Sequence, residues 1–394
     1  MEEGSRRVTA VLPDELVVDI LARLPAKSIC RCKCVCRAWR ALISDPANRS
    51  RLAQTLSGIF FSRPDGSCPP WGFAGLPAPP PPGVDTALSF LPVTCGEMEL
   101  LDPCNGLLLL RCKSARGLPA PPPFNTVCNP ATGEWVALPP PSRTPGRSEY
   151  FAEFDEILNT CVAALGFDPA VSSHFHVFQL VQELYYYDFI FWAVEIYSSE
   201  TGRWVFRVGV WDEGDDLRIT GQMTYFNGFL HFCTLSNAVV SVDTKGQAWR
   251  LSRVQHNVTY CYDSFISHSQ GRLIYVYDNW RDDVLSIYVL EDHDSEEWVW
   301  VFKQSINKLD LSGPRTEEWG YYTAVFHPNS DMIFFYDWPQ KRLMSYNMKH
   351  RDVQVICTVG EVLQLLFGEY FDQRRLFLPY VPFYSGVLAS PSVN

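Results

Sequence analysis

The chain lacks long hydrophobic runs: none of its segments approaches the roughly 18 consecutive apolar residues that a membrane-spanning helix needs. The start of the sequence, Met1-Glu2-Glu3 and then Asp14 and Glu15, also lacks the apolar stretch of a signal peptide. These absences predict a protein without a membrane partner, located in the cytoplasm, the nucleus or both.

Basic residues are fewer than acidic ones: the chain has 33 Lys and Arg against 44 Asp and Glu, which gives a net charge of −11. Neutralising nucleic-acid phosphates requires a basic face, so this balance disfavours a nucleic-acid partner. The charge is unevenly spread: residues 1–55 hold 10 basic and 6 acidic side chains, a balance of +4, so residues 56–394 carry −15. A small basic module therefore precedes a large acidic one.

The 13 cysteines lack a repeated spacing, and in a reducing compartment we interpret them as small buried apolar residues. Cys30, Cys32, Cys34 and Cys36 alternate along the chain. Steps of two scatter side chains around a helix, so one metal ion could not collect all four. The sequence predicts neither a metal site nor a cofactor.

The start of the chain has the periodicity of three short helices. Leu12-Pro13-Asp14-Glu15 is a typical helix start, because proline suits the first turn and acidic residues there favour the helix dipole. Apolar residues follow at three- and four-residue steps until Pro25, a second helix starts near 26–28, and a third apolar stripe runs over 35–43. A module this small buries little surface and is marginal alone, which indicates docking to a partner.

The segment LPDELVVDILARLPAKSICRCKCVCRAWRALISDP, residues 12–46, resembles the F-box throughout. The Leu-Pro opening, the Ile-Leu pair before Arg23-Leu24-Pro25, and Val35-Cys36-Arg37 with Trp39-Arg40 stand in the family's order. The resemblance implies binding to the Skp adaptor and, through it, to a cullin. Carried over by motif, the adaptor contacts are expected at Leu12, Pro13, Leu16, Ile20, Leu21, Leu24, Pro25, Val35 and Trp39. The alternative is that some of these side chains, such as Val35 and Trp39, only hold the three helices together.

Beyond the F-box segment the composition changes twice. Residues 56–86 become rich in Pro and Gly and are predicted to form a linker between a 1–55 F-box domain and an 87–394 body. In that body, short apolar or alternating runs such as 107–110 and 273–277 are separated by turn signals, which is typical of β-strands. The body is therefore predicted to be all-β.

A polar turn that leads into a tryptophan recurs at Trp135, Trp204, Trp249 and Trp298, with spacings of 69, 45 and 49 residues. Spacings in the forties suit a four-stranded propeller blade, and we interpret these tryptophans as packing anchors repeated once per blade. The C-terminal strand near 377–381 is expected to close the ring against an early strand, for which 88–91 is the candidate.

The phrases CNPATGEW, VEIYSSETGRW and FLPYVPFYSGVL resemble the plant F-box-associated, kelch-like region. Together with the F-box, this resemblance implies a multidomain α + all-β chain, a three-helix F-box followed by a kelch-like β-propeller. The diglycine pair of true kelch repeats is absent. We expect about six blades, with five or seven as alternatives.

Catalytic and metal motifs are incomplete. His350-Arg351-Asp352 lacks the asparagine that a kinase loop needs five residues later, where Cys357 stands. Asp292, Asp294 and Glu296 lack the glycine of a calcium loop, and no third metal ligand stands near His174 and His176. We therefore expect no catalytic residues and no enzyme activity.

The predicted function is that of the substrate-recognition subunit of a Skp/cullin/F-box ubiquitin ligase, with an unknown target protein bound by the propeller. The alternatives are an F-box scaffold that acts outside the ligase and, less favoured, a propeller hydrolase with carboxylates gathered at one mouth. The irregular stretches Arg143–Thr160 and Val210–Gly221 are the candidate recognition loops.

Overall fold

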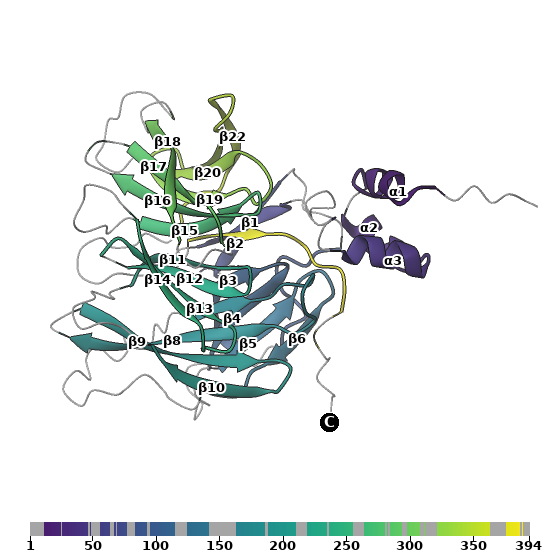
Figure 1. The fold of residues 1–394 in the computed structure, drawn as a ribbon, viewed down its shortest axis with the longest axis horizontal. Helices are drawn as coiled ribbons and strands as arrows, with labels where there is room; N and C mark the ends of the chain where they lie inside the picture. Colours follow the sequence, from purple (N-terminus) through teal and green to yellow (C-terminus); the bar gives the residue numbers. More distant parts are fainter. Residues whose placement is uncertain are drawn as a thin grey trace, which may run out of the picture. The chain divides into compact units, whose positions relative to one another are not determined.

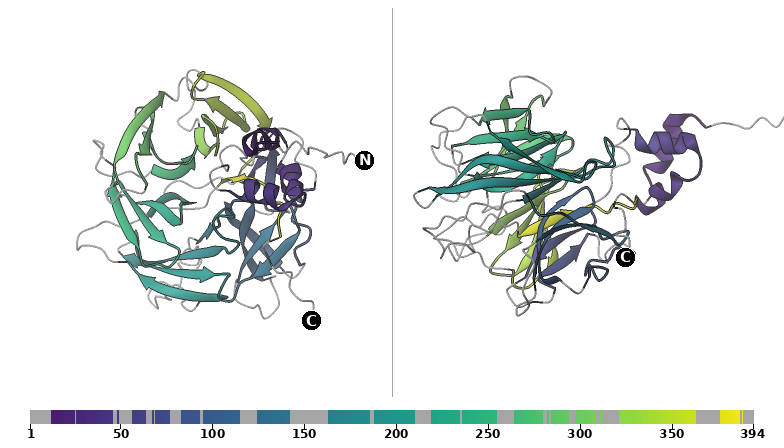
Figure 2. Two further views of the ribbon diagram at one scale, coloured as in Figure 1. Left: turned by 45° about the vertical axis from the view of Figure 1, so that its right-hand side comes forward. Right: turned by 90° about the horizontal axis from the view of Figure 1, so that it is seen from below.

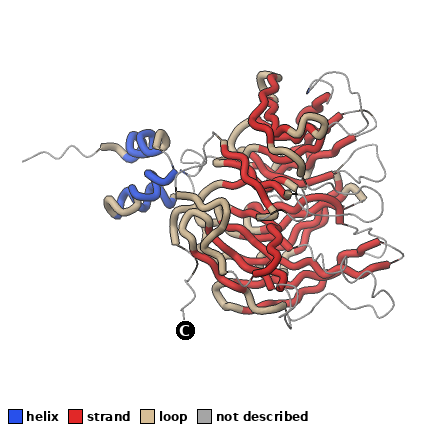
Figure 3. Tube along the Cα trace, turned by 180° about the vertical axis from the view of Figure 1, so that it is seen from behind, coloured by secondary structure: helices blue, strands red, loops and turns tan. Residues whose placement is uncertain are grey.

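In a computed structural model, the chain divides into two compact units, Met1–Thr55 and Leu56–Asn394. The structure describes residues 12–24, 26–45, 48, 56–63, 67, 69–76, 83–92, 95–114, 124–141, 163–185, 188–209, 219–234, 236–254, 264–279, 282, 284–293, 298–307, 311, 321–362, 376–386 and 388. The first unit holds the helices α1 (Asp14–Leu21), α2 (Ala26–Cys32) and α3 (Arg37–Ser44). The second unit is built of strands (Figure 1, Figure 3).

The strands form six antiparallel sheets, which we number as blades 1–6. Blade 1 is β3 (Cys95–Cys104), β4 (Leu107–Ser114), β5 (Phe124–Asn129) and β6 (Glu134–Ala137). Blade 2 is β7 (Ala163–Gly166), β8 (His176–Tyr185), β9 (Asp188–Ser198) and β10 (Arg203–Val208). Blade 3 is β11 (Ile219–Phe226), β12 (Phe229–Thr234), β13 (Ala238–Asp243) and β14 (Trp249–Arg253). Blade 4 is β15 (Ser264–Ser269), β16 (Arg272–Asn279), β17 (Val284–Leu290) and β18 (Trp300–Asn307). Blade 5 is β19 (Tyr321–Phe326), β20 (Met332–Asp337), β21 (Arg342–Asn347) and β22 (Asp352–Thr358).

Blade 6 combines the two ends of the second unit. Its strands, in the order β2-β1-β23, are β2 (Trp71–Gly75), β1 (Gly58–Ser62) and β23 (Phe377–Tyr380). The first strand of each of blades 1–4 contacts that of the next blade, and β23 contacts both β19 and β3, so the sheets close into a ring (Figure 2). The predicted helical F-box region followed by a six-bladed β-propeller is confirmed.

Two expectations about blade 6 are corrected. Residues 56–86, expected to form a linker, contain β1 and β2, and the glycines Gly58, Gly72 and Gly75 lie within these two short strands. The C-terminal strand does pair with an early strand, but the partner of β23 is β1, not 88–91. Leu88 has a φ of 56°, a turn conformation that a strand does not use.

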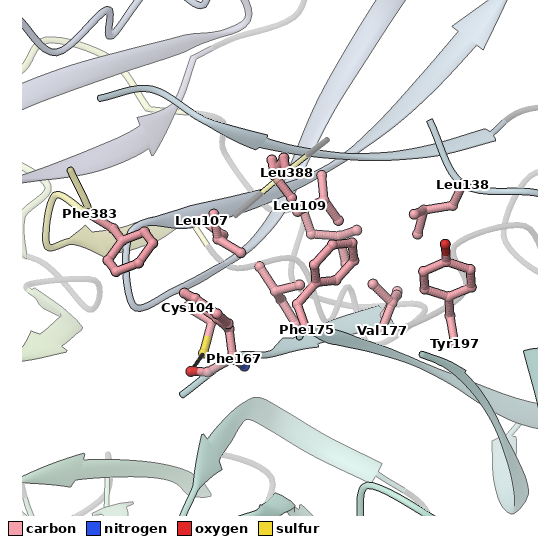
Figure 4. Close-up of a cluster of buried hydrophobic side chains, with 13 residues drawn as sticks. Cys104, Leu107, Leu109, Leu138, Phe167, Phe175, Val177, Tyr197, Phe383 and Leu388 are labelled. Carbon is pink, nitrogen blue, oxygen red and sulfur yellow. Dashed lines mark hydrogen bonds between the residues drawn. The ribbon is translucent and has the colours of Figure 1, made fainter. Parts of the chain in front are cut away.

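The core is divided into clusters that lie between neighbouring blades. The middle strands of a blade contribute side chains to the clusters on both of its faces. In β4, Leu107 and Leu109 face the cluster between blades 1 and 2 (Figure 4). Leu108 and Leu110 face the cluster between blades 6 and 1. All four side chains are fully buried. The continuous apolar run at 107–110 thus follows from a strand that is covered on both faces.

Side-chain hydrogen bonds join the first strands of blades 1 and 2, where the strand backbones do not pair. The backbone N–H of Leu165 donates to Oδ2 of the buried Asp102 at 2.8 Å. Asn105 Nδ2 donates to the backbone oxygen of Phe167 at 2.6 Å. These bonds fix the angle between adjacent blades by satisfying backbone groups that the core would otherwise leave unpaired.

The four repeated tryptophans lie at the start of the outermost strands of blades 1–3 and just before that of blade 4. Trp135, Trp204 and Trp249 lie in β6, β10 and β14, and Trp298 lies just before β18. Each packs against a different inter-blade cluster, but each is only partly buried. Truncating one of them should therefore cost less than the about 3–5 kcal/mol of a fully buried aromatic ring.

His231 in β12 is completely buried, and burial lowers its pKa to about 3. Its Nδ1 lies 2.7 Å from Ser241 Oγ and its Nε2 lies 3.1 Å from the backbone oxygen of Phe226. The folded protein therefore holds this imidazole neutral at pH values where the unfolded chain begins to protonate it.

We predict that His231 lowers stability as the pH falls below about 6.5, because from there to about pH 3 the unfolded chain binds a proton that the folded chain does not. Between pH 8 and pH 5 the loss is roughly 2 kcal/mol. The free energy of unfolding, measured in urea at both pH values, should change less in His231→Gln than in the wild type. An equal pH dependence in the two proteins would contradict this assignment.

Removing β23 by ending the chain at residue 375 should abolish cooperative folding of the second unit, because it unpairs β1 and leaves blades 5 and 1 uncovered. Soluble yield and the sharpness of thermal melting are the measurements. A soluble product that melts like the full chain would show that the sheets are independent modules.

Candidate adaptor-docking site

The candidate docking site lies on α1. Pro13 occupies the position before the helix, and its backbone oxygen accepts from the N–H groups of Leu16 at 3.0 Å and Val17 at 3.1 Å. Asp14 and Glu15 fill the first turn, where negative charge is favourable. The Leu-Pro-Asp-Glu sequence thus starts the helix as expected.

The apolar residues of this helix fall on two faces. Val17, Val18 and Leu21 are buried and form the centre of the three-helix core. Leu16 and Ile20 are 49% and 48% exposed, although each is a large apolar side chain. Residues four apart lie on the same side of a helix, so these two form an exposed stripe.

Leu12 extends this spacing just before the helix and is 51% exposed. We call Leu12, Leu16 and Ile20 the α1 stripe. Val35, in the turn between α2 and α3, is 63% exposed, and Pro13 is also exposed. Exposed apolar side chains gain free energy when a partner removes them from water, so five of the nine expected contact residues are available for docking.

The remaining expected contact residues are not exposed in the same way. Leu21 is fully buried within the helical unit, so its expected role in docking is corrected: its side chain is part of the core that positions α1. Leu24 and Trp39 are partly buried and pack against that core, and each retains some exposed surface. Pro25 lies outside the described residues. Periodicity alone did not separate these faces, because 16, 17, 20, 21 and 24 form one broad apolar arc.

The cysteines of this unit have local structural roles. Cys36 precedes α3, and its Sγ accepts from the backbone N–H of Trp39 at 3.4 Å. Cys32 packs against the helical core, while Cys34 is exposed. Within the described part of the chain, no group of three or more His, Cys, Asp or Glu side chains is placed to hold a metal ion. No helix among those residues is long and apolar enough to cross a membrane.

The basic residues around α2 and α3 are mostly exposed. Arg31, Arg37 and Arg40 are exposed, and Lys33 is partly buried. The Arg40 Nε–H donates to the backbone oxygen of Lys33 at 3.3 Å. Exposed basic side chains on α2 and α3 suit a partner with negative charge.

The second unit has two different faces. Successive strands of a blade are antiparallel, so the tight turns at 105–106, 227–228 and 270–271 all lie on one face, the tight-turn face. The connections between blades, including 138–162 and 209–218, begin and end at the opposite face. The candidate loop Arg143–Thr160, and Val210–Gly221 up to the start of β11, lie outside the described residues.

The start of β1 lies on the tight-turn face, because β1 is antiparallel to β23 and β23 ends there. A close contact supports this placement: a Cβ added to Gly106 in the turn after β3 would lie 2.3 Å from Cβ of Phe383, which follows β23. The chain therefore enters the second unit on the face opposite to the inter-blade connections.

The incomplete kinase-like and histidine motifs do not form a catalytic site among the described residues. His350 and Arg351 lie in the turn between β21 and β22, and both are exposed. His174 is exposed, while burial lowers the pKa of His176.

Comparison with known proteins matches both units. The family described as F-box protein At3g26010-like, beta-propeller, matches residues 89–365, and the F-box-like family matches residues 9–55. Among curated relatives from Arabidopsis thaliana, the putative F-box protein At1g30920 is 25% identical over 340 residues, covering 78% of this chain and 77% of that protein. The F-box protein At5g07610 is 25% identical over 348 residues, covering 79% and 74%.

Among solved structures, the chain aligns with the Cps50 (Swd1) beta-propeller domain of Myceliophteria thermophila at a TM-score of 0.38 and 8% identity, over 66% of this chain and 71% of that one. That likeness is too weak to bear on function. The names of the matching families indicate an adaptor rather than an enzyme. With the helical unit matched as F-box-like and most of the second unit matched by the propeller family, the chain belongs to the F-box proteins that carry this β-propeller.

Proposed function

We propose that this F-box protein is a substrate-recognition subunit of a Skp/cullin/F-box ubiquitin ligase, acting in the cytoplasm, the nucleus or both. The observation that carries the proposal is the α1 stripe, three large apolar side chains about half exposed on a helical unit whose core is formed by other residues. The Skp adaptor covers this stripe, and the adaptor joins the chain to a cullin.

The propeller binds the target protein in this proposal. Its closed ring of antiparallel blades gives a rigid body, and rigid bodies position variable loops well. The inter-blade connections begin and end on the face opposite to the one where the chain enters from the F-box unit. That face is the proposed target-binding face, and the kelch-like character of the blades stays a prediction.

The double variant Leu16→Ala, Ile20→Ala should weaken copurification of the Skp adaptor at least tenfold, about 1.4 kcal/mol, because it removes apolar area from the docking surface. Hydrogen exchange in α1 and α3 should stay as in the wild type, since both side chains lie outside the core. Adaptor binding that survives this change would rule out the α1 stripe as the docking site.

Two controls separate docking from folding. Leu21→Ala should raise hydrogen exchange throughout the three helices, because truncating a buried leucine costs about 2–5 kcal/mol. Val171→Ala, at a position that is 81% exposed in the propeller, should change neither exchange in the helices nor adaptor binding.

Recruitment of a cullin distinguishes a ligase subunit from an F-box scaffold acting outside the ligase. Copurification from plant cells should yield the adaptor and a cullin together, and the double variant in the α1 stripe should lose both. Adaptor without cullin would favour the scaffold.

A further inference from the structure

Beyond β23 the chain does not leave the propeller at once. Residues 381–386 and Leu388, which we call the strap, continue from blade 6 to blades 1 and 2 on the tight-turn face. Val381 packs against the cluster between blades 5 and 6, whereas Phe383 and Leu388 are part of the cluster between blades 1 and 2 (Figure 4). Phe383 and Leu388 are each only 5% exposed.

Phe383 lies where the backbone of the strap approaches the backbone of the turn after β3 closely. A Cβ added to Gly106 would lie 2.3 Å from Phe383 Cβ and 2.5 Å from its backbone nitrogen, so no side chain fits there. Gly106 also has a φ of +91°, which glycine adopts without strain. The ring of Phe383 meets that of Phe167 edge to face, with their centroids 5.3 Å apart.

One polar contact fixes the strap along its length. Asn129, at the end of β5, donates from Nδ2 to the backbone oxygen of Phe383 at 2.8 Å. Asn129 is fully buried, and its Oδ1 accepts from the N–H of Ala131 at 3.0 Å, which orients the amide. The strap is thus recognised as an extended peptide is, by an aromatic anchor in an apolar seat and a hydrogen bond to its backbone.

The strap residues are outside the strand ladder that holds β23, so strap docking and strand pairing are separable. We propose that the strap is a detachable lock on ring closure. When docked, it ties blade 6 to blades 1 and 2; when released, it exposes the site that holds Phe383, formed with Phe167 and Asn129, and this site binds the same C-terminal sequence in trans. This regulation of the propeller does not depend on the proposed ligase function.

The test uses the full-length chain and a chain that ends at Tyr380, which keeps β23 but lacks the strap. The shortened chain should still melt cooperatively, at a lower temperature than the full-length protein. A synthetic peptide of residues 381–394 should bind it in fluorescence anisotropy and raise its melting temperature. The same peptide with Phe383→Ala should bind at least tenfold more weakly, and the full-length chain should bind neither peptide.

If the shortened chain does not fold, the full-length variant Phe383→Ala serves as a second test. Hydrogen exchange should rise in β23 and β1 and stay unchanged in blades 3 and 4. The matched control is Phe178→Ala, a fully buried ring between blades 2 and 3, which should raise exchange there instead. An unchanged melting temperature of the shortened chain, a folded shortened chain that ignores the peptide, or exchange that rises evenly around the ring would overturn the proposal.

Discussion

Antiparallel pairing of β23 with β1 is the constraint on which the rest of the propeller depends. It joins Gly58 to Tyr380 and Phe61 to Phe377, segments from the two ends of the second unit. Every core cluster of that unit lies between two blades, so opening the ring at one point would leave two apolar sheet faces in water. Ring closure therefore converts six marginal sheets into one body.

Both-sided burial explains what could be predicted from the sequence and what could not. Runs such as Leu107–Leu110 indicate strands covered on two faces, and the recurrent polar turn before a tryptophan indicates blades. The partner of β23 was not predictable, because ring closure pairs residues that no local signal connects. β1 and β2 were hidden by the Pro- and Gly-rich segments around them, which resemble those of a linker.

The helical unit shows a similar limit. Sequence periodicity located α1, but the broad apolar arc did not reveal that Leu21 faces the core while Leu16 and Ile20 face solvent. That distinction depends on where α3 packs, which is a tertiary property. A helical unit whose small core leaves an apolar stripe exposed is suited to docking, whereas the propeller offers a rigid body with two dissimilar faces.

In the proposed function, the α1 stripe couples the propeller to ubiquitin transfer. The most direct test of this coupling is reconstitution with purified Skp adaptor, cullin, RING subunit and ubiquitin-conjugating enzyme, in which ubiquitin conjugated to the F-box protein itself is measured over time. We expect conjugates with the wild-type chain and their loss with Leu16→Ala, Ile20→Ala. Equal conjugation by both proteins, or none by the wild type in a complex shown to contain the cullin, would contradict it.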